Sequence, residues 1–166
     1  HSLQLRMDML NFGNLLNGDW GVGQRLVSNQ PLLVTAGQQA DAQGRYAHPR
    51  DPQGLTNASF KGFGRAEAEE DGSYVFDTIK PGVVTGRNGR FMAPHINVWV
   101  VARGINLGLN TRLYFSDEAE ANAKDAVLNV IEWEARRKTL VAQREVKDGV
   151  VTYRFDIRLQ GDGETV

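Results

Sequence analysis

The sequence predicts a mainly β domain whose strands form a sandwich or a barrel. Two observations support this fold class. Short stretches with strand patterns are separated by turn-forming residues about every ten positions, and strands do not alternate with helices as in an α/β sheet. Only one short stretch has the pattern of a helix. The 166 residues suffice for one domain with its own core.

The first part of the chain differs from the rest. Residues 1–37 are rich in glycine and asparagine and show no sustained period, which predicts an arm or loop, with Leu32 to Val34 as a possible short strand. Asp41 to Gly44 is a predicted turn. His48 to Lys61 is expected to be irregular because prolines and glycines interrupt it. We therefore divide the chain into residues 1–37, an atypical arm or first strand, and residues 38–166, the β domain.

Four later stretches show the alternation of strands, in which successive side chains point to opposite faces of a sheet. They are Ser73 to Ile79, Pro94 to Gly104, Thr111 to Phe115 and Val150 to Leu159. The apolar face of the last stretch consists of Val151, Tyr153, Phe155, Ile157 and Leu159. Thr139 to Val146 is predicted to pair with that stretch, because the residues Lys147-Asp148-Gly149 between them have the chemistry of a hairpin turn.

The predicted helix covers Asp117 to Lys124. Ser116 precedes it as a candidate N-cap residue, and Asp117 and Glu118 place negative charge in the first turn, where the helix dipole favours it. Asp125 is expected to end the helix.

The composition excludes several classes of function. A formal net charge of -1 gives no basic surface for nucleic acid and no polybasic anchor for a membrane. No apolar run is long enough to span a bilayer, and residues 1–20 lack the pattern of a signal peptide. Cysteine is absent, which excludes disulfides and thiol nucleophiles and predicts a cytoplasmic protein. The start at His1 and the stop at Val166 suggest trimming at one end or both.

The stretch from Pro94 to Gly104 carries part of a metal-binding pattern. As a strand, it places on one face His95, Asn97, Trp99, Val101 and Arg103. A histidine at position 97 would complete a pair of imidazoles, whereas the carboxamide of Asn97 is a poor ligand for transition metals. The three histidines, at positions 1, 48 and 95, have no histidine within four residues. We therefore expect no metal held by this chain alone.

Each candidate also has a purely structural interpretation. His95 is then a hydrogen-bonded strand histidine and Arg103 one half of an ion pair, and on the residues alone we prefer this interpretation. The acidic cluster from Glu67 to Asp71 lacks the ligand spacing of a calcium loop and is expected to be a solvated turn. The sequence contains no nucleotide-binding fingerprint and no serine nucleophile elbow.

A resemblance to a known family adds to this. Residues from about Gln39 to Val166, more than three quarters of the chain, resemble the intradiol ring-cleaving dioxygenases. The matching segments are Q-A-D-A-Q-G-R-Y at 39–46, G-F-G-R at 62–65, T-I-K-P-G at 78–82, M-A-P-H-I-N at 92–97, A-R-G-I-N at 102–106, T-R-L-Y-F-S-D-E-A-E-A-N-A at 111–123 and Y-R-F-D-I-R-L-Q-G-D-G-E-T-V at 153–166. The resemblance implies a β-sandwich with irregular loops and one short helix.

The resemblance also implies a lost metal site. Iron-binding members hold Fe(III) with two tyrosines and two histidines, and the histidines come from a His-Ile-His version of the strand near position 95. His95 stands at the first histidine position and Asn97 at the second. Val83 to Thr85 replaces one tyrosine position, and Asp51 to Gly54 contains no tyrosine for the other. The residues thus resemble those of an iron-free alpha subunit.

From this resemblance we expect a hetero-oligomer of alpha–beta protomers in which the beta subunit binds Fe(III). The implied reaction opens the ring of protocatechuate with O2 to give 3-carboxy-cis,cis-muconate, a step of aromatic catabolism in the beta-ketoadipate pathway. The family's substrate pocket lies at the alpha–beta interface. Arg103, in A-R-G-I-N, matches an arginine of the pocket wall, where it would help to hold the substrate carboxylate. No catalytic residue is expected in this chain alone.

Two departures and two alternatives accompany the resemblance. Gln38 stands where the family has a tryptophan, and residues 1–37 do not align, so the family's N-terminal pocket residues have no counterparts to assign here. One alternative is a stand-alone β-sandwich binding or structural protein derived from the family. The other is a single-chain catechol dioxygenase with an unusual site, which requires this chain to bind iron by itself.

Overall fold

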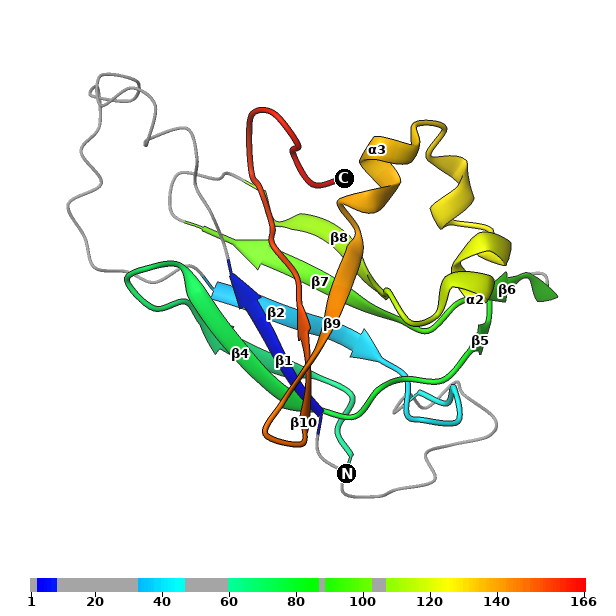
Figure 1. The fold of residues 1–166 in the computed structure, drawn as a ribbon, viewed down its shortest axis with the longest axis horizontal. Helices are drawn as coiled ribbons and strands as arrows, with labels where there is room; N and C mark the ends of the chain where they lie inside the picture. Colours follow the sequence, from blue (N-terminus) through cyan, green and yellow to red (C-terminus); the bar gives the residue numbers. More distant parts are fainter. Residues whose placement is uncertain (1–2, 9–32, 47–59, 87–88, 103–106) are drawn as a thin grey trace.

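The computed structural model describes residues 3–8, 33–46, 60–86, 89–102 and 107–166 (Figure 1). The strands in these ranges are β1 (Leu3–Asp8), β2 (Leu33–Gln39), β3 (Gly64–Glu67), β4 (Ser73–Thr78), β5 (Val84–Thr85), β6 (Phe91–Met92), β7 (His95–Val101), β8 (Leu109–Phe115), β9 (Val141–Lys147) and β10 (Val150–Arg154). The helical elements are α2 (Ala119–Lys124), the 3-10 turn η2 (Leu128–Val130) and α3 (Glu134–Lys138). None of these helices has the length and apolar character needed to cross a membrane.

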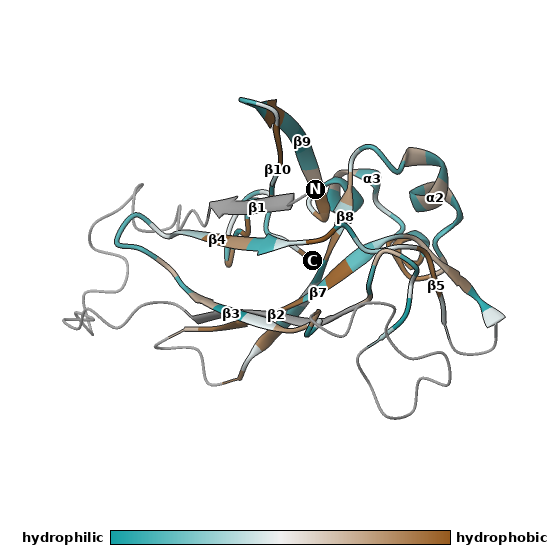
Figure 2. Ribbon diagram, turned by 90° about the horizontal axis from the view of Figure 1, so that it is seen from below, coloured by the Kyte–Doolittle hydropathy of each residue, from teal (hydrophilic) through white to brown (hydrophobic). Residues whose placement is uncertain are grey.

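The strands form two packed layers. Their hydrogen-bonding order is β3-β2-β7-β8-β9-β10-β1-β4, with β5 and β6 as a separate small ribbon. The sheet folds over at β8 and β9, which pair in parallel only through Tyr114 with Val141 and Phe115 with Ala142. β3 and β4 then lie at separate levels (Figure 2). Because β3 and β4 do not pair with each other in the described residues, the structure is a sandwich, as the family resemblance predicted, and not a closed barrel.

The main core lies between the two layers. On β7 the residues Ile96, Val98 and Val100 are buried, and Leu113 and Phe115 on β8 join them. The opposite layer contributes the buried aromatic residues Tyr74, Phe76, Tyr153 and Phe155. Burial of these large side chains is the main stabilising contribution to the fold.

A second, smaller core lies on the other side of β8. Ala93, Tyr114, Leu128 and Leu140 are buried together there. Leu128 lies in η2 and Leu140 follows α3, so the segment between β8 and β9 packs back onto the sheet (Figure 1). This packing gives the sheet a covered outer face at one end, which is where the candidate site lies.

The helical predictions were partly wrong. Asp125 does end α2, but the helix begins only at Ala119, and Glu118 precedes it without a side-chain cap. The Ser116 hydroxyl instead accepts a hydrogen bond from the backbone N–H of Arg144 at 3.0 Å, which ties β9 to the end of β8. The sequence also predicted a single helix, whereas η2 and α3 follow α2. Leu128 of η2 and Leu140, just after α3, pack against Tyr114 of β8.

Most strand predictions are confirmed. Ser73 to Ile79 corresponds to β4 and Thr111 to Phe115 to the second half of β8. The β9–β10 hairpin turns at Asp148 and Gly149, whose φ angles of 52° and 77° suit a tight turn of this kind. β10 ends at Arg154, earlier than predicted, although Phe155 and Ile157 continue the buried face.

Residues 1–37 were predicted to form an arm or first strand, and their described part contributes β1 and the start of β2. β1 inserts between β10 and β4, and the predicted short strand at Leu32 to Val34 extends as β2 to Gln39. Both strands find partners that are distant in the sequence, which local periodicity does not reveal.

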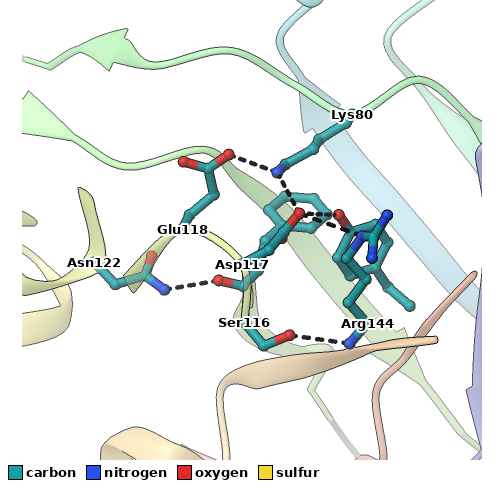
Figure 3. Close-up of polar contacts among 8 residues, drawn as sticks. Lys80, Ser116, Asp117, Glu118, Asn122 and Arg144 are labelled. Atoms are coloured by element: carbon teal, nitrogen blue, oxygen red, sulfur yellow. Dashed lines mark hydrogen bonds and ion pairs between the residues drawn. The ribbon is translucent and has the colours of Figure 1, made fainter. Parts of the chain in front are cut away.

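A cluster of charged and aromatic residues holds the two layers together where β8 ends (Figure 3). The Lys80 ammonium lies 3.0 Å from Asp117 Oδ2 and also contacts Glu118. The Tyr153 hydroxyl donates to the same Asp117 oxygen at 2.7 Å, and Arg144 Nε approaches it at 3.6 Å. Asp117 therefore connects β10, β9 and the segment after β4 instead of serving the first turn of a helix.

These contacts shift the protonation equilibria of the cluster. Burial alone would raise the pKa of Asp117, but the hydrogen bonds from Tyr153 and Lys80 and the positive charge of Lys80 lower the pKa overall. Burial would likewise lower the pKa of Lys80, but its hydrogen bonds to Glu118 and Asp117 raise that pKa overall. The ionised pair is thus the favoured state of the folded protein.

We expect Asp117→Asn to lower the free energy of unfolding at pH 7 by about 1 kcal/mol. Since folding lowers the pKa of Asp117 below its usual value of 3.8, its ionised form stabilises the fold above that pH, and the contribution is lost as pH falls further. Urea unfolding between pH 7 and pH 2 should show wild type and variant converging at low pH. Glu120→Gln, on an exposed residue of α2, is the control, and a constant difference at all pH values would contradict the assignment.

Candidate functional site

The candidate site lies on the outer face of β7 and β8. Because Ile96, Val98 and Val100 point into the core, the alternation of β7 places Asn97 and Trp99 on the opposite face. This confirms the predicted sharing of a face. On β8, Arg112 pairs with Asn97 and projects to the same side, as does Tyr114, the partner of His95.

An open cavity of about 1170 Å3 lies over this face. β7 and β8 form its floor, the residues around the β5–β6 ribbon form one wall, and the segment from Ala126 to Ile131 forms another. Its polar groups include Asn97, Asn110 and Arg112, and much of the rest of its lining is apolar. The volume of this cavity is larger than that of one small organic molecule, so such a ligand can enter it.

Arg112 dominates the polar part of the cavity. Its Nε donates to Asn97 Oδ1 at 3.0 Å, and its Nη1 lies 3.7 Å from the sulfur of Met92. The carboxamide of Asn97 is thus held by a guanidinium group. The contact connects β7, β8 and β6, so it also fixes the orientation of Asn97.

A buried carboxylate, Asp125, organises the wall beside the cavity. Its side-chain oxygens accept hydrogen bonds from the backbone N–H groups of Ala93, Val127 and Leu128, at 2.8, 2.8 and 2.6 Å. The Tyr114 hydroxyl adds a fourth at 3.2 Å. Asp125 is fully buried, and these donors compensate for its loss of hydration. The wall formed by Ala126 to Ile131 therefore depends on this one side chain.

His95 and Tyr114 lie beneath the cavity. His95 is 3% exposed, and its Nδ1 lies 2.7 Å from the carbonyl oxygen of Ala93, which requires Nδ1 to be the donor. Burial lowers the pKa of His95, and the nearby charge of Arg112 lowers it further, so the neutral imidazole is favoured at pH 7. Burial raises the pKa of Tyr114 to about 12, which keeps its phenol protonated.

These residues do not fit a ferric ion. A site for it needs several anionic or imidazole donors that converge, and Asn97 supplies neither charge nor imidazole. Arg112 moreover places a fixed positive charge beside Asn97, where it would repel a metal cation. Among the residues that the structure describes, no group of three or more His, Asp or Glu side chains is arranged to hold a metal.

The structure places only some of the predicted site residues. His95 and Asn97 lie on β7 as expected, whereas Arg103 and Asp51 to Gly54 are outside the described residues. In the segment Val83 to Thr85, which the resemblance places at a tyrosine position, Val84 is buried in β5 and pairs with Met92 of β6. Because Met92 also contacts Arg112, the ribbon brings Val84 close to Arg112. The sequence did not reveal this proximity.

Two segments that carry the family resemblance lie against each other. The backbone N–H of Gly82, in T-I-K-P-G, donates to the carbonyl of Asp41, in Q-A-D-A-Q-G-R-Y, at 2.8 Å. Gly82 has no room for a side chain, because a Cβ would lie 2.5 Å from the carbonyl oxygen of Ala42. Close backbone packing accounts for the glycine in this segment.

Comparison with known proteins identifies the family. A family model described as Dioxygenase matches residues 30–161. The alpha chain of protocatechuate 3,4-dioxygenase from Pseudomonas putida is 56% identical over 129 residues, which cover 77% of this chain. The chain belongs to the dioxygenase family. The same subunit from Burkholderia cepacia is 43% identical over 161 residues, 95% of this chain and 75% of that protein. The chain spans 62% of the length of this Pseudomonas relative.

Solved structures confirm the fold. Chlorocatechol 1,2-dioxygenase from Pseudomonas putida is 16% identical, with a TM-score of 0.58 over 93% of this chain and 58% of that one. The 3-chlorocatechol 1,2-dioxygenase from Rhodococcus opacus 1CP is 18% identical, with a TM-score of 0.61 and the same coverage. A dioxygenase domain from Streptomyces sp. SirexAA-E is 22% identical, with a TM-score of 0.59 over 99% of this chain and 80% of that one. At these identities the similarity shows a shared fold alone.

Sequence reasoning missed Arg112 and Asp125. The alternation of T-R-L-Y-F already placed Arg112 and Tyr114 on one face of β8, but their contact with Asn97 depends on the register between β7 and β8. Asp125 was interpreted only as the end of a helix. Its role requires the chain to bring Ala93 and Tyr114 next to it, and nothing local in the sequence indicates that.

We expect Asp125→Ala to lower the free energy of unfolding by about 3 kcal/mol, because four donors lose their shared acceptor. Urea unfolding followed by circular dichroism measures this loss. Glu132→Ala removes an exposed carboxylate a few residues away and should change stability by less than about 0.5 kcal/mol. Equal losses for the two variants would show that Asp125 is not the organising residue.

Proposed function

We propose that this chain is the iron-free alpha subunit of a protocatechuate 3,4-dioxygenase. In this proposal a beta subunit binds Fe(III), and the alpha–beta assembly opens the ring of 3,4-dihydroxybenzoate between its hydroxylated carbons. Both atoms of O2 enter the product, 3-carboxy-cis,cis-muconate. The main support is the identity of 56% to an alpha chain of that name, together with the contact between Asn97 and Arg112 in the cavity, which does not suit a metal cation.

The beta partner is part of the proposal for a chemical reason. Ring cleavage by O2 in this family depends on iron, and the residues at the corresponding position here include Asn97 and the positively charged Arg112. A chain of this kind contributes to the reaction only next to a metal-binding subunit. We also propose a cytoplasmic location, with which the cysteine-free sequence is compatible.

Within this proposal, Arg103 is the residue by which the chain contacts the substrate. An arginine guanidinium matches a carboxylate with two parallel hydrogen bonds, so Arg103 would hold the carboxylate of the substrate at the subunit interface. Such a residue orients the ring for the chemistry that the beta subunit performs and does not itself react.

Co-purification tests the subunit assignment. The chain carrying an affinity tag is co-expressed with the beta chain of its own organism, and the purified material is analysed for iron and for O2 uptake with protocatechuate. We expect a stoichiometric complex with iron and activity, and a partner-free chain with neither. Stoichiometric iron in the partner-free chain would instead support a single-chain dioxygenase. Failure to form any complex would support a stand-alone binding or structural protein.

Arg103→Ala tests the pocket-wall assignment. In the assembled enzyme, we expect kcat/KM for protocatechuate to fall about ten-fold or more, because a charge-assisted contact to the substrate is lost. The iron content should stay unchanged, since Arg103 holds no metal in this proposal. Lys147→Ala, which removes a charge at the exposed β9–β10 turn, is the control. Unchanged kinetics for Arg103→Ala would contradict the assignment.

A further inference from the structure

We propose that the cavity over β7 and β8 is a metal-free binding site for a small aromatic carboxylate, with Arg112 as the residue that holds the carboxylate group. The residues that carry this proposal all lie in the described part of this chain, and the proposed site requires neither iron nor a partner. It therefore goes beyond the proposed subunit role. The ligand would be bound and not transformed, because the cavity offers no reactive group for ring opening.

The first argument is the unbalanced charge of Arg112. The residue is half-buried, and among the described residues no carboxylate forms an ion pair with it. Asp125, the buried carboxylate of this region, already accepts four hydrogen bonds from other donors. A partly desolvated cation without a counter-charge favours the binding of an anion.

The second argument is the unused donor capacity of the guanidinium. Arginine has five N–H donors. Asn97, the weakly accepting sulfur of Met92 and the Tyr114 hydroxyl account for three of them. The remaining N–H groups can donate to a carboxylate, and the contacts with Asn97 and Met92 restrict how the side chain moves. Arg90, exposed in the cavity lining, adds a second positive charge.

The third argument concerns the apolar part of the ligand. Around Arg112 the cavity exposes Trp99, Val130 and Ile131, and the side chain of Val130 is 74% exposed. The Trp99 indole packs over Gly108, where an added Cβ would come 1.8 Å from its nitrogen, so a residue without a side chain is needed there. An indole held in this way beside a cation suits a planar ring with a carboxylate at one end.

Together these features favour an aromatic acid over an inorganic anion. A phosphate or sulfate would satisfy Arg112 but leave the apolar walls in contact with water, whereas a neutral ring would leave the guanidinium without a counter-charge. The cavity volume of about 1170 Å3 accommodates a single substituted ring in several positions, so we expect moderate affinity.

The probe is 4-hydroxybenzoate, and its neutral counterpart is 4-hydroxybenzamide, which has nearly the same shape. Binding to the purified, iron-free full chain without a beta subunit is measured by isothermal titration calorimetry. We expect saturable binding of 4-hydroxybenzoate with a Kd of about 1 mM or tighter, and at least about ten-fold weaker binding of the benzamide. Equal binding of the two probes, or none by 4-hydroxybenzoate, would overturn the proposal.

Two variants locate the site. Arg112→Gln should weaken binding of 4-hydroxybenzoate about ten-fold or more and reduce the preference over the benzamide. Arg136→Gln, which removes an exposed charge on α3 outside the cavity lining, should leave the Kd unchanged. Unchanged binding by a folded Arg112→Gln protein would overturn the assignment. If thermal melting shows that this variant does not fold, Trp99→Leu keeps the test open, because loss of the ring contact should weaken 4-hydroxybenzoate several-fold.

Competition with inorganic phosphate separates a specific site from a general attraction of anions. We expect phosphate at equal concentration to displace little 4-hydroxybenzoate. Full displacement would show that the site binds anions without specificity, and it would overturn the proposal.

The outcome of these binding tests is independent of the subunit assignment. If the chain binds 4-hydroxybenzoate but forms no complex with a beta subunit, the site is supported and the proposed function is contradicted. If it forms the complex but does not bind 4-hydroxybenzoate, the proposed function is supported and the site is contradicted.

Discussion

The alternation of side chains along β7 is the constraint on which the rest of the structure depends. Ile96, Val98 and Val100 must point between the two layers, because they supply the centre of the main core. Because one face of β7 is buried, the direction of the alternate side chains is fixed toward the other face. Asn97 and Trp99 therefore face outward, where the segment between β8 and β9 folds over them and turns a sheet surface into a cavity.

The cavity persists without a metal because its walls are held by the protein itself. Asp125 gathers four donors from three different segments, and the Lys80–Asp117 cluster keeps the end of β8 attached to β10. In a metal-binding relative the ion can add to this stability. Here Arg112 donates to Asn97 at the floor of the cavity, so a fixed positive charge lies where it would repel a metal cation.

The chain belongs to a dioxygenase family, but the residues in its cavity do not suit a metal ion. The identity to alpha chains extends over most of the chain, and the segments that carry it include the tight contact between Gly82 and Asp41. These segments maintain the scaffold. The floor of the cavity, by contrast, carries the carboxamide of Asn97 and the guanidinium of Arg112, which are poor groups for binding a metal cation.

Local patterns in the sequence determined the strands of the domain, the tight turn at Asp148-Gly149 and the common face of His95, Asn97 and Trp99, because a two-residue period is visible along the chain itself. The quoted motifs determined the family. Only the tertiary structure decided that residues 1–37 contribute β1 and most of β2, that Ser116 and Asp117 join strands instead of capping a helix, and that Arg112 and Asp125 build the cavity. Each of these depends on pairing or hydrogen bonding between residues far apart in the sequence, and such contacts leave no local periodicity.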